Sequence, residues 1–332
     1  MKRRIPLLIL IVLALFYFFY VRGVGIYPAA SPPETVDRGV ATKTYQWVTK
    51  AEMPTARSEV SAASLDGKVY VIGGFDGLGR TSASVEQYDP ATDTWTKGAP
   101  LPEPRHHAVA VSAGHTLYVI GGFTGFGFDP KADVFALDAS SNRWRRVAPL
   151  PEKRGAAAAA WVDGKIHSVG GIGPDGLSND LFVYDPEADR WTRKTPASLR
   201  RDHLAAAALS GLFYVAGGRE RSLSSNLAAL EIYNPTTDRW HSGPSMPTPR
   251  GGVAGAVFDA LFVVVGGEKR TDTYGEVEAF DLENNRWIQL PNLPTPRHGL
   301  AAVTIGDVLY AIGGGKNPGL SVSGTNEALR VR

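Results

Sequence analysis

The chain has 332 residues, of which 43% are hydrophobic and 20% charged, so it is long and apolar enough to bury a sizeable core. It contains no cysteine, which excludes disulfides, thiolate metal sites, cysteine nucleophiles and redox motifs. The net charge of +2 comes from four basic residues in the first thirty, and the remaining 31 basic and 33 acidic residues sum to −2, which excludes the basic field that nucleic-acid binding requires.

An apolar segment, "IPLLILIVLALFYFFYV", spans residues 5–21 between the basic "MKRR" and Arg22. As a helix it would rise about 26 Å, the short limit for a membrane span. The basic flank predicts that residues 2–4 stay in the cytoplasm and that everything after Arg22 lies outside it, in the periplasm or the extracellular space. Because the aromatic "FYFFY" end is typical of a membrane interface, we interpret residues 1–22 as an uncleaved signal anchor. Cleavage as a signal peptide after Gly25, with export, is the alternative.

Residues 23–43 are rich in proline and glycine and are interpreted as a linker. From residue 44 to the end, three residue types recur in step, with spacings of 48, 49, 47, 49 and 47 residues. Double glycines begin at Gly73, Gly121, Gly170, Gly217, Gly266 and Gly313. Tryptophans stand at Trp47, Trp95, Trp144, Trp191, Trp240 and Trp287, and arginines at Arg57, Arg105, Arg154, Arg201, Arg250 and Arg297. Such coincident periods indicate a repeat protein of six units.

Each period is predicted to contain four short strands, for example "HAVAVSA", "TLYVIGG", "DVFALD" and "RWRRV", and no helix. The second strand is nearly all apolar, which favours burial on both faces, and its Gly-Gly end favours positive φ or a close backbone approach. Trp47 precedes the first double glycine and no tryptophan follows the last, so the final sheet must borrow its outer strand from "TYQWVTK" at 44–50. The sequence therefore predicts an all-β fold: one six-bladed β-propeller over residues 44–332, closed by an N-terminal outer strand.

The motifs "YDPATDTW", "YDPEADRW" and "YNPTTDRW", together with the double glycines and arginines, resemble the kelch repeat over residues 44–331. The second and fifth units, with "LDASSNRW" and "FDLENNRW", depart from it only by lacking the proline. The resemblance implies that the loop before each first strand and the loop after each second strand lie on one face, around the central channel. It therefore places the six repeated arginines near that face.

Six converging guanidiniums would suit a carboxylate or an acidic peptide, so Arg57, Arg105, Arg154, Arg201, Arg250 and Arg297 are candidate ligand-binding residues. A residue repeated in every blade also suits a structural role, bonding neighbouring carbonyls, and we favour that interpretation for each arginine singly. The residues after the arginines differ from unit to unit ("SE", "HH", "GA", "DH", "GG", "HG") and symmetry does not explain them. These positions supply the candidates His106, His107, His203 and His298, beside Glu59 and Asp202.

Imidazoles at one channel mouth would suit a metal or acid–base chemistry, but we favour surface histidines bonded to loops and predict neither a metal site nor a cofactor. The loops after the double glycines add Arg219, Glu220 and Arg221, next to the charged "EKR" at 268–270, as either a solvated rim or a ligand-binding sector. Phe123, Phe126 and Phe128 are predicted to be exposed aromatic residues in the second of these loops.

These observations favour a membrane-anchored, extracytoplasmic binding module that takes a protein or carbohydrate at the channel mouth and is not an enzyme. The alternative is a carbohydrate-active enzyme, since some kelch propellers that this chain resembles act as sialic-acid epimerases (mutarotases). Such an enzyme needs only one acid and one base, so it would leave almost no motif. Chemistry of the galactose-oxidase type is disfavoured, because it needs a cysteine cross-linked to a tyrosine and the chain has no cysteine.

Overall fold

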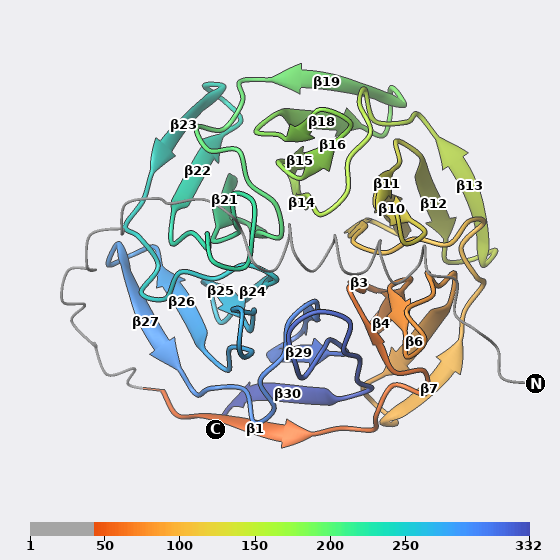
Figure 1. Cartoon of the computed structure of the whole chain (residues 1–332), viewed down its shortest axis with the longest axis vertical. Coiled ribbons are helices and arrows are strands. Elements are labelled where there is room, and N and C mark those ends of the chain that lie inside the picture. Colours follow the sequence, from red (N-terminus) through yellow and green to blue (C-terminus); the bar gives the residue numbers. More distant parts are fainter. Residues whose placement is uncertain (1–42) are drawn as a thin grey trace, which may run out of the picture.

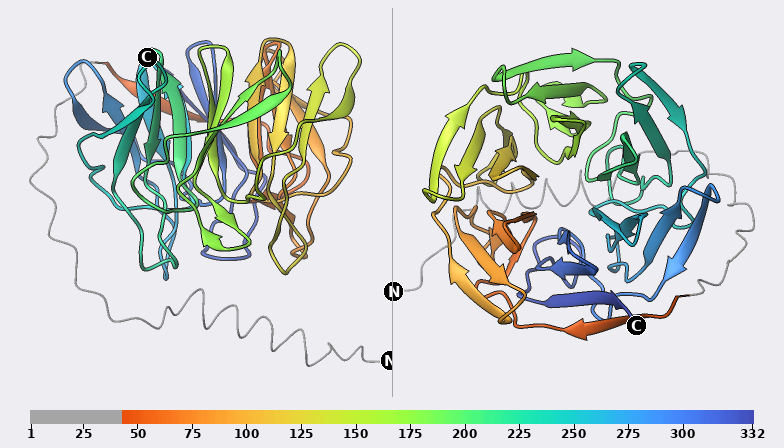
Figure 2. Two further views of the ribbon diagram at one scale, coloured as in Figure 1. Left: turned by 90° about the horizontal axis from the view of Figure 1, so that it is seen from above. Right: turned by 180° about the vertical axis from the view of Figure 1, so that it is seen from behind.

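Six four-stranded antiparallel sheets stand side by side around a common axis in the computed structural model, which describes residues 43–332 (Figure 1). The predicted anchor and nearly all of the predicted linker lie outside the described residues. Each sheet runs radially, with its first strand at the axis and its fourth strand at the rim (Figure 2). The structure therefore confirms the all-β, six-bladed propeller predicted from the repeats.

The strands of each blade are given from the axis outward. Blade 1 contains β3 (Ser61–Leu65), β4 (Lys68–Ile72), β6 (Val85–Asp89) and β7 (Thr94–Lys97), and blade 2 contains β8 (Val109–Ala113), β9 (Thr116–Ile120), β12 (Val134–Asp138) and β13 (Arg143–Val147). Blade 3 contains β14 (Ala158–Val162), β15 (Lys165–Val169), β18 (Leu181–Asp185) and β19 (Arg190–Lys194), and blade 4 contains β20 (Ala205–Leu209), β21 (Leu212–Ala216), β22 (Leu230–Asn234) and β23 (Arg239–Ser242). Blade 5 contains β24 (Ala254–Phe258), β25 (Leu261–Val265), β26 (Val277–Asp281) and β27 (Arg286–Leu290), and blade 6 contains β28 (Ala301–Ile305), β29 (Val308–Ile312), β30 (Asn326–Val331) and β1 (Tyr45–Thr49).

Three two-residue pairs lie in the connecting loops. They are β2 (Arg57–Ser58) with β5 (Phe75–Asp76), β10 (Phe123–Thr124) with β11 (Asp129–Pro130), and β16 (Ile172–Gly173) with β17 (Gly176–Leu177).

Blade 6 joins the two ends of the described chain. β1 pairs antiparallel with β30, with Tyr45 opposite Val331 and Thr49 opposite Glu327. In Figure 1 the two strands lie side by side at the rim, although they carry the opposite ends of the colour scale. This pairing confirms the predicted closure of the ring by an N-terminal outer strand and covers the edge that β30 would otherwise expose.

An apolar cluster fills each of the six spaces between neighbouring blades. Between blades 6 and 1, for example, Val69 and Val71 of β4 pack with Tyr310 and Ile312 of β29. The second strand of every blade is buried on both faces because a neighbouring blade covers each one, which is why its sequence is mostly apolar, with His167 and Ser168 of β15 as buried exceptions.

The outer-strand tryptophan of each blade donates from Nε1 to a backbone carbonyl in the linker that enters the same blade. Trp95 donates to Ala51 O at 2.8 Å, and the other five tryptophans make the equivalent bond at 2.7–2.8 Å. In blade 1 the carboxylate of Asp93 accepts from Ala51 N and from the Tyr88 hydroxyl. The Y-[DN]-P-x-x-D-x-W pattern therefore serves to hold the linker between two blades.

The double glycines mark a close approach between neighbouring blades. Gly74 N donates to Arg105 O at 2.8 Å, and a Cβ on Gly73 would lie 2.3 Å from that same oxygen. The second glycine of every other blade donates in the same way to the carbonyl of the arginine in the next blade, including Gly314 N to Arg57 O across the closure. Any larger residue would push these neighbours apart.

Residues 43–332 contain no helix that is long and apolar enough to span a membrane.

Removal of β1 should destabilise the ring, because it uncovers β30 and takes Tyr45 and Trp47 from the cluster between blades 5 and 6. We expect residues 51–332 to lose about 3 kcal/mol or more of unfolding free energy relative to residues 43–332, the usual cost of deleting a large packed aromatic side chain. Urea unfolding followed by circular dichroism measures this. Equal stability of the two chains would contradict closure through β1.

Acid should destabilise the protein through His167, which is buried in β15 between blades 3 and 4 beside Phe213 and Tyr233. Burial lowers the pKa of His167 to about 4. Between pH 6.5 and 4 the unfolded chain therefore binds a proton that the native state rejects, and the free energy of unfolding falls as the pH falls. Relative to His167→Phe, the wild type should lose up to about 3 kcal/mol more between pH 7.5 and 4. Denaturant unfolding across this range checks the difference, and parallel pH profiles would show that His167 contributes nothing.

Candidate functional site

The loop that enters each blade pairs with the loop that follows the second strand of that blade. In blade 1 this pairing is β2 with β5. In the other blades one bridge joins the residue after the repeated arginine to the residue after the double glycine: His106 with Phe123, Gly155 with Ile172, Asp202 with Arg219, Gly251 with Glu268, and His298 with Gly315. Both sets of loops thus lie on one side of the ring, along the lower edge of the left view in Figure 2, as the kelch resemblance implied. We call this side the loop face.

One residue further along each entering loop, six equivalent positions surround the axis. They are Glu59, His107, Ala156, His203, Gly252 and Gly299, all with φ between 51° and 71°. Each backbone N–H from His107 onward donates to the carbonyl of the preceding member at 2.9–3.1 Å, and Val60 N closes the circle on Gly299 O at 3.4 Å. This axial ring holds the six blades together at the channel mouth.

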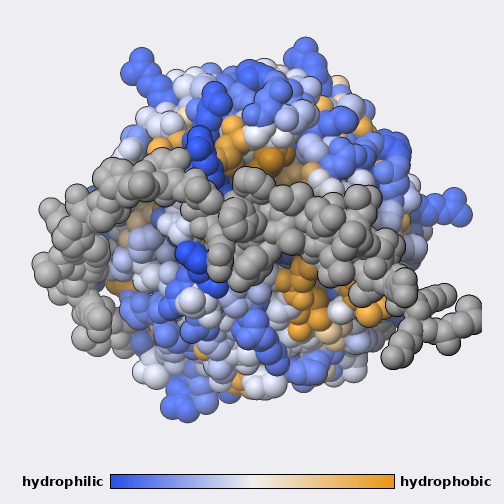
Figure 3. All heavy atoms as spheres, viewed as in Figure 1, coloured by the Kyte–Doolittle hydropathy of each residue, from blue (hydrophilic) through white to orange (hydrophobic). Residues whose placement is uncertain are grey.

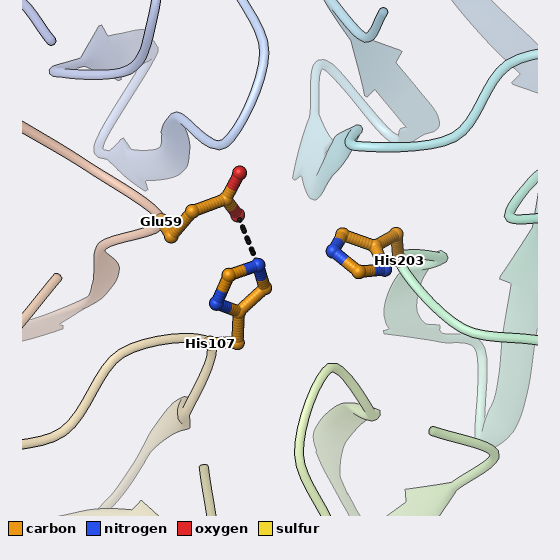
Figure 4. Close-up of side chains that lie close together, drawn as sticks. All are labelled: Glu59, His107 and His203. Atoms are coloured by element: carbon orange, nitrogen blue, oxygen red, sulfur yellow. Dashed lines mark ion pairs between the residues drawn. The ribbon is translucent and has the colours of Figure 1, made fainter. Parts of the chain in front are cut away.

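Three members of the axial ring carry ionisable side chains, Glu59, His107 and His203, and these converge (Figure 4). His107 Nε2 lies 3.1 Å from Glu59 Oε2, and the His107 and His203 rings meet edge to face with centroids 4.8 Å apart. The other three members are alanine or glycine. A Cβ on Gly299 would lie 2.5 Å from Glu59 Oε1, so the absence of a side chain there makes room for the carboxylate.

Further buried ionisable residues extend this group. His298 Nδ1 lies 3.2 Å from Glu59 Oε1 and 3.5 Å from Glu268 Oε2. Arg219 donates from Nη1 to Glu268 at 2.8 Å and from Nε to Asp202 at 3.2 Å, and Asp202 in turn accepts from His203 Nδ1. His106 Nδ1 lies 2.6 Å from His107 Nδ1. We call these eight residues the axial cluster: Glu59, His106, His107, Asp202, His203, Arg219, Glu268 and His298.

Burial and charge act differently on the imidazoles of the axial cluster. Burial by itself lowers the pKa of His298, but the carboxylates of Glu268 and Glu59 outweigh it and raise that pKa to about 9. Burial lowers the pKa of His106 to about 4 and holds the pKa of His107 well below its usual range. Burial raises the pKa of the Glu59 carboxyl, and the surrounding histidines lower it by more, so that it lies well below its usual range. At neutral pH His298 is therefore charged and lies beside an ionised Glu59.

The four candidate histidines are brought together by the fold. All are buried, with exposed fractions of 0% for His106, 9% for His107, 8% for His203 and 1% for His298. The interpretation of these histidines as surface groups is therefore wrong. His107 and His203 are buried as members of the axial ring, whereas His106 and His298 lie one residue earlier and bridge to Phe123 and Gly315.

The six repeated arginines lie inside the blades. Four of them pair with a buried glutamate of the third strand in their own blade: Arg57 with Glu86, Arg201 with Glu231, Arg250 with Glu278, and Arg297 with Glu327. They also donate to carbonyls at the end of the second strand, as Arg57 does to Gly73 O and Val71 O. This placement matches the structural interpretation of these arginines, because their donors are directed at their own blade.

The buried guanidinium groups of Arg105 and Arg154 have different partners from those of the other four arginines. Phe135 and Phe182 occupy the position of the buried glutamate in blades 2 and 3, and the two guanidiniums lie 5.5 Å and 5.6 Å from those rings. Their ion pairs go to acids nearer the surface, such as Asp133 and Asp180. The second residue of the third strand is glutamate in four units and phenylalanine in these two, so the sequence at that position indicates which side chain packs against the arginine.

The charged residues in the loops after the double glycines are partly buried and partly exposed. Arg219 and Glu268 belong to the buried axial cluster, whereas Glu220, Arg221, Lys269 and Arg270 are exposed. Glu268 was predicted to lie in the charged rim. The sequence signal for its burial is its position directly after a double glycine, since that position bridges to the entering loop. Of the three phenylalanines, Phe126 is exposed as predicted, but Phe123 is buried and Phe128 is half-buried against Phe75 and His106.

Comparisons with known proteins agree with this architecture. The family model described as the KLHDC2/KLHL20/DRC7 Kelch-repeats domain matches residues 96–245 and 195–323, and the Kelch motif model matches residues 56–102.

Individual relatives match in part or in fold. Beta-scruin of Limulus polyphemus is 50% identical over 48 residues, which are 14% of this chain and 5% of that protein's length. The solved structure described as "Structure of YjhT" superimposes with a TM-score of 0.71 at 16% identity, covering 85% of this chain and 98% of the other. At that identity the likeness concerns the fold.

Removing Arg250 should destabilise the fold rather than a ligand complex. Arg250→Met leaves the Glu278 carboxylate buried and without its cation, which typically costs about 3–5 kcal/mol. Arg250→Met with Glu278→Gln should recover part of this loss, because the buried charge is then gone. Arg105→Met is the matched control and should lose less, since its acids Glu103 and Asp133 are partly exposed. Urea unfolding measures all four proteins, and unchanged stability of Arg250→Met would contradict the structural role.

Proposed function

The chain belongs to the kelch-repeat family, and from this premise we propose that it is a binding module that docks a protein partner on its loop face and catalyses no reaction itself. One observation carries the proposal. The three large hydrophobic side chains that are most exposed among residues 43–332 gather on that face, in the loops of three consecutive blades.

These residues are Leu78, Phe126 and Leu320, with exposed fractions of 73%, 55% and 53%. They come from blades 1, 2 and 6, which are neighbours in the ring. Gly79 lies between them, because a Cβ on it would be 3.2 Å from the Phe126 ring and 3.9 Å from Leu320 Cδ1. We call Leu78, Phe126 and Leu320 the apolar patch. Clustered exposed apolar and aromatic side chains are typical of protein interaction sites.

The opposite side of the loop face carries exposed charged side chains. The exposed Glu220 and Arg221 of blade 4 and Lys269 and Arg270 of blade 5 lie across the axis from the apolar patch. Figure 3 views this face and has hydrophobic atoms at the surface in the sector of blades 6 and 1, among hydrophilic neighbours. An apolar sector facing a charged one gives a partner both an anchoring surface and a fixed orientation.

We place the propeller outside the cytoplasm on a membrane anchor formed by residues 1–22. The support for this is the apolar segment 5–21 and its basic flank, which lie outside the described residues.

A carbohydrate-active enzyme such as a sialic-acid epimerase is the second candidate, and the axial cluster is the observation in its favour, because it holds carboxylates and imidazoles within a few ångströms of one another. That candidate would use the repeated arginines for the carboxylate of the sugar. Their burial and their pairing inside the blades favour the binding module instead.

The absence of cysteine from the sequence allows a direct test. Phe126→Cys places a single thiol in the apolar patch of the full-length protein, and His115→Cys places one on the opposite face, in the β8–β9 turn where the side chain is 90% exposed. A membrane-impermeant maleimide should label both in intact host cells if the propeller lies outside the cytoplasm. After attachment of a benzophenone maleimide, irradiation should give a discrete protein adduct from position 126 and none from position 115.

Adding Leu78→Ser and Leu320→Ser to Phe126→Cys should reduce the adduct at least about 10-fold, because loss of two anchor side chains costs more than 1.4 kcal/mol in a typical interface. Equal adducts from both faces, or none from either, would overturn the docking proposal. If the protein adduct from position 126 disappears when free sugars are added, the loop face binds a glycan instead.

A further inference from the structure

The hydrogen-bond chain behind His107 fixes which of its nitrogens carries the proton. His106 Nε2 lies 3.2 Å from Gly125 O, and a carbonyl oxygen only accepts, so His106 Nε2 donates. A neutral imidazole carries one N–H, so His106 Nδ1 accepts and His107 Nδ1, 2.6 Å away, donates to it. His107 Nε2 is then left with a lone pair directed at the Glu59 carboxylate.

The same logic applies to His203. Its Nδ1 contacts the carboxylate of Asp202, which accepts, so Nδ1 carries a proton, and in the neutral imidazole Nε2 keeps the lone pair. A carboxylate that orients an imidazole through Nδ1 is the usual outer-sphere partner of a metal-binding histidine. Asp202 is itself fixed by Arg219 at 3.2 Å.

In the neutral forms of both histidines, three acceptor groups therefore meet on the axis: the Glu59 carboxylate, His107 Nε2 and His203 Nε2. Each of the three residues offers a ligand atom within 4.8 Å of the other two, and His107 Nε2 lies 3.1 Å from Glu59 Oε2. A tetrahedral zinc ion about 2.1 Å from each ligand holds its ligand atoms about 3.4 Å apart, which small side-chain rotations reach from here. In Figure 4 all three side chains face the same space.

The other charges of the axial cluster are already matched. His298 lies between Glu59 and Glu268, and Arg219 joins Glu268 to Asp202. The neighbouring triad Glu59, Glu268 and His298 is the weaker candidate, because it offers a single imidazole and its Glu268 carboxylate already pairs with Arg219 at 2.8 Å.

We propose that the propeller binds one divalent transition-metal ion, of the zinc class, on its axis through Glu59, His107 and His203. Two imidazoles and one carboxylate form a ligand set that suits such ions and leaves a fourth position for water or a ligand atom. The three residues enter from blades 1, 2 and 4, so the ion would cross-link the ring from within. The proposal does not rest on the docking of a partner.

The full-length protein, treated with a chelator and dialysed, tests this by calorimetric titration with Zn²⁺ alone. We expect one equivalent to bind and to raise the midpoint of thermal unfolding, because an ion that binds only the native ring stabilises it. Co²⁺ should bind the same site and give the visible absorption of a nitrogen and oxygen site. No thiolate band is expected, since the chain has no cysteine.

Glu59→Gln is the most discriminating variant, because an amide keeps the shape and supplies the donor that His107 Nε2 lacks. Zn²⁺ affinity should fall at least about 100-fold, more than the usual loss of an outer-sphere partner, while the metal-free variant stays as stable as the metal-free wild type. His203→Gln should lose binding similarly. His115→Ala, which removes an exposed histidine paired with Asp66, is the matched control and should bind like the wild type.

If the wild-type chain binds no stoichiometric Zn²⁺ or Co²⁺, the proposal is wrong. A proton on Glu59 or His107, shared in a hydrogen bond between them, would then satisfy these acceptor atoms. Binding that survives Glu59→Gln and His203→Gln but is lost in His115→Ala would also overturn it, because the ion would then be held at the surface.

Discussion

Each blade depends on the next for a backbone hydrogen bond. The second glycine after every second strand donates to the carbonyl of the arginine that enters the following blade, and the first glycine leaves that carbonyl room. The bond exists only when a following blade is present, so the last blade needs the first. Closure by β1 satisfies that need, and the tryptophans and the apolar clusters between blades then repeat around the whole ring. A change at one blade boundary therefore acts on two blades.

This architecture separates residues that hold the ring from residues free to differ. The repeated arginines belong to the first kind, and their partners vary with the blade: a buried glutamate in four blades, and a phenylalanine with more exposed acids in two. In the axial ring the side chains differ from blade to blade, although the backbone hydrogen bonds are the same in every blade. Its conformation tolerates glycine and alanine, and the protein places one glutamate and two histidines among them.

The loop face thereby has two levels. At its rim the apolar patch lies across the axis from a charged sector, and the rigid ring holds both on the same face. Below it, at the axis, the axial cluster lies among buried side chains where charges interact strongly because little water surrounds them.

The sequence by itself determined the fold: the coincident periods of glycine, arginine and tryptophan define six blades, and the position of Trp47 ahead of the first double glycine defines the closure, because these are local patterns that every repeat expresses. It also identified the histidines of the axial cluster, as residues that symmetry does not explain. Only the tertiary structure decided that they are buried, that Glu268 and Arg219 join them at the axis, and that the arginines are directed into their own blades. The reason is that these contacts join residues up to 239 positions apart, as His298 and Glu59 are, and no local pattern encodes which side chains meet at the axis of a closed ring.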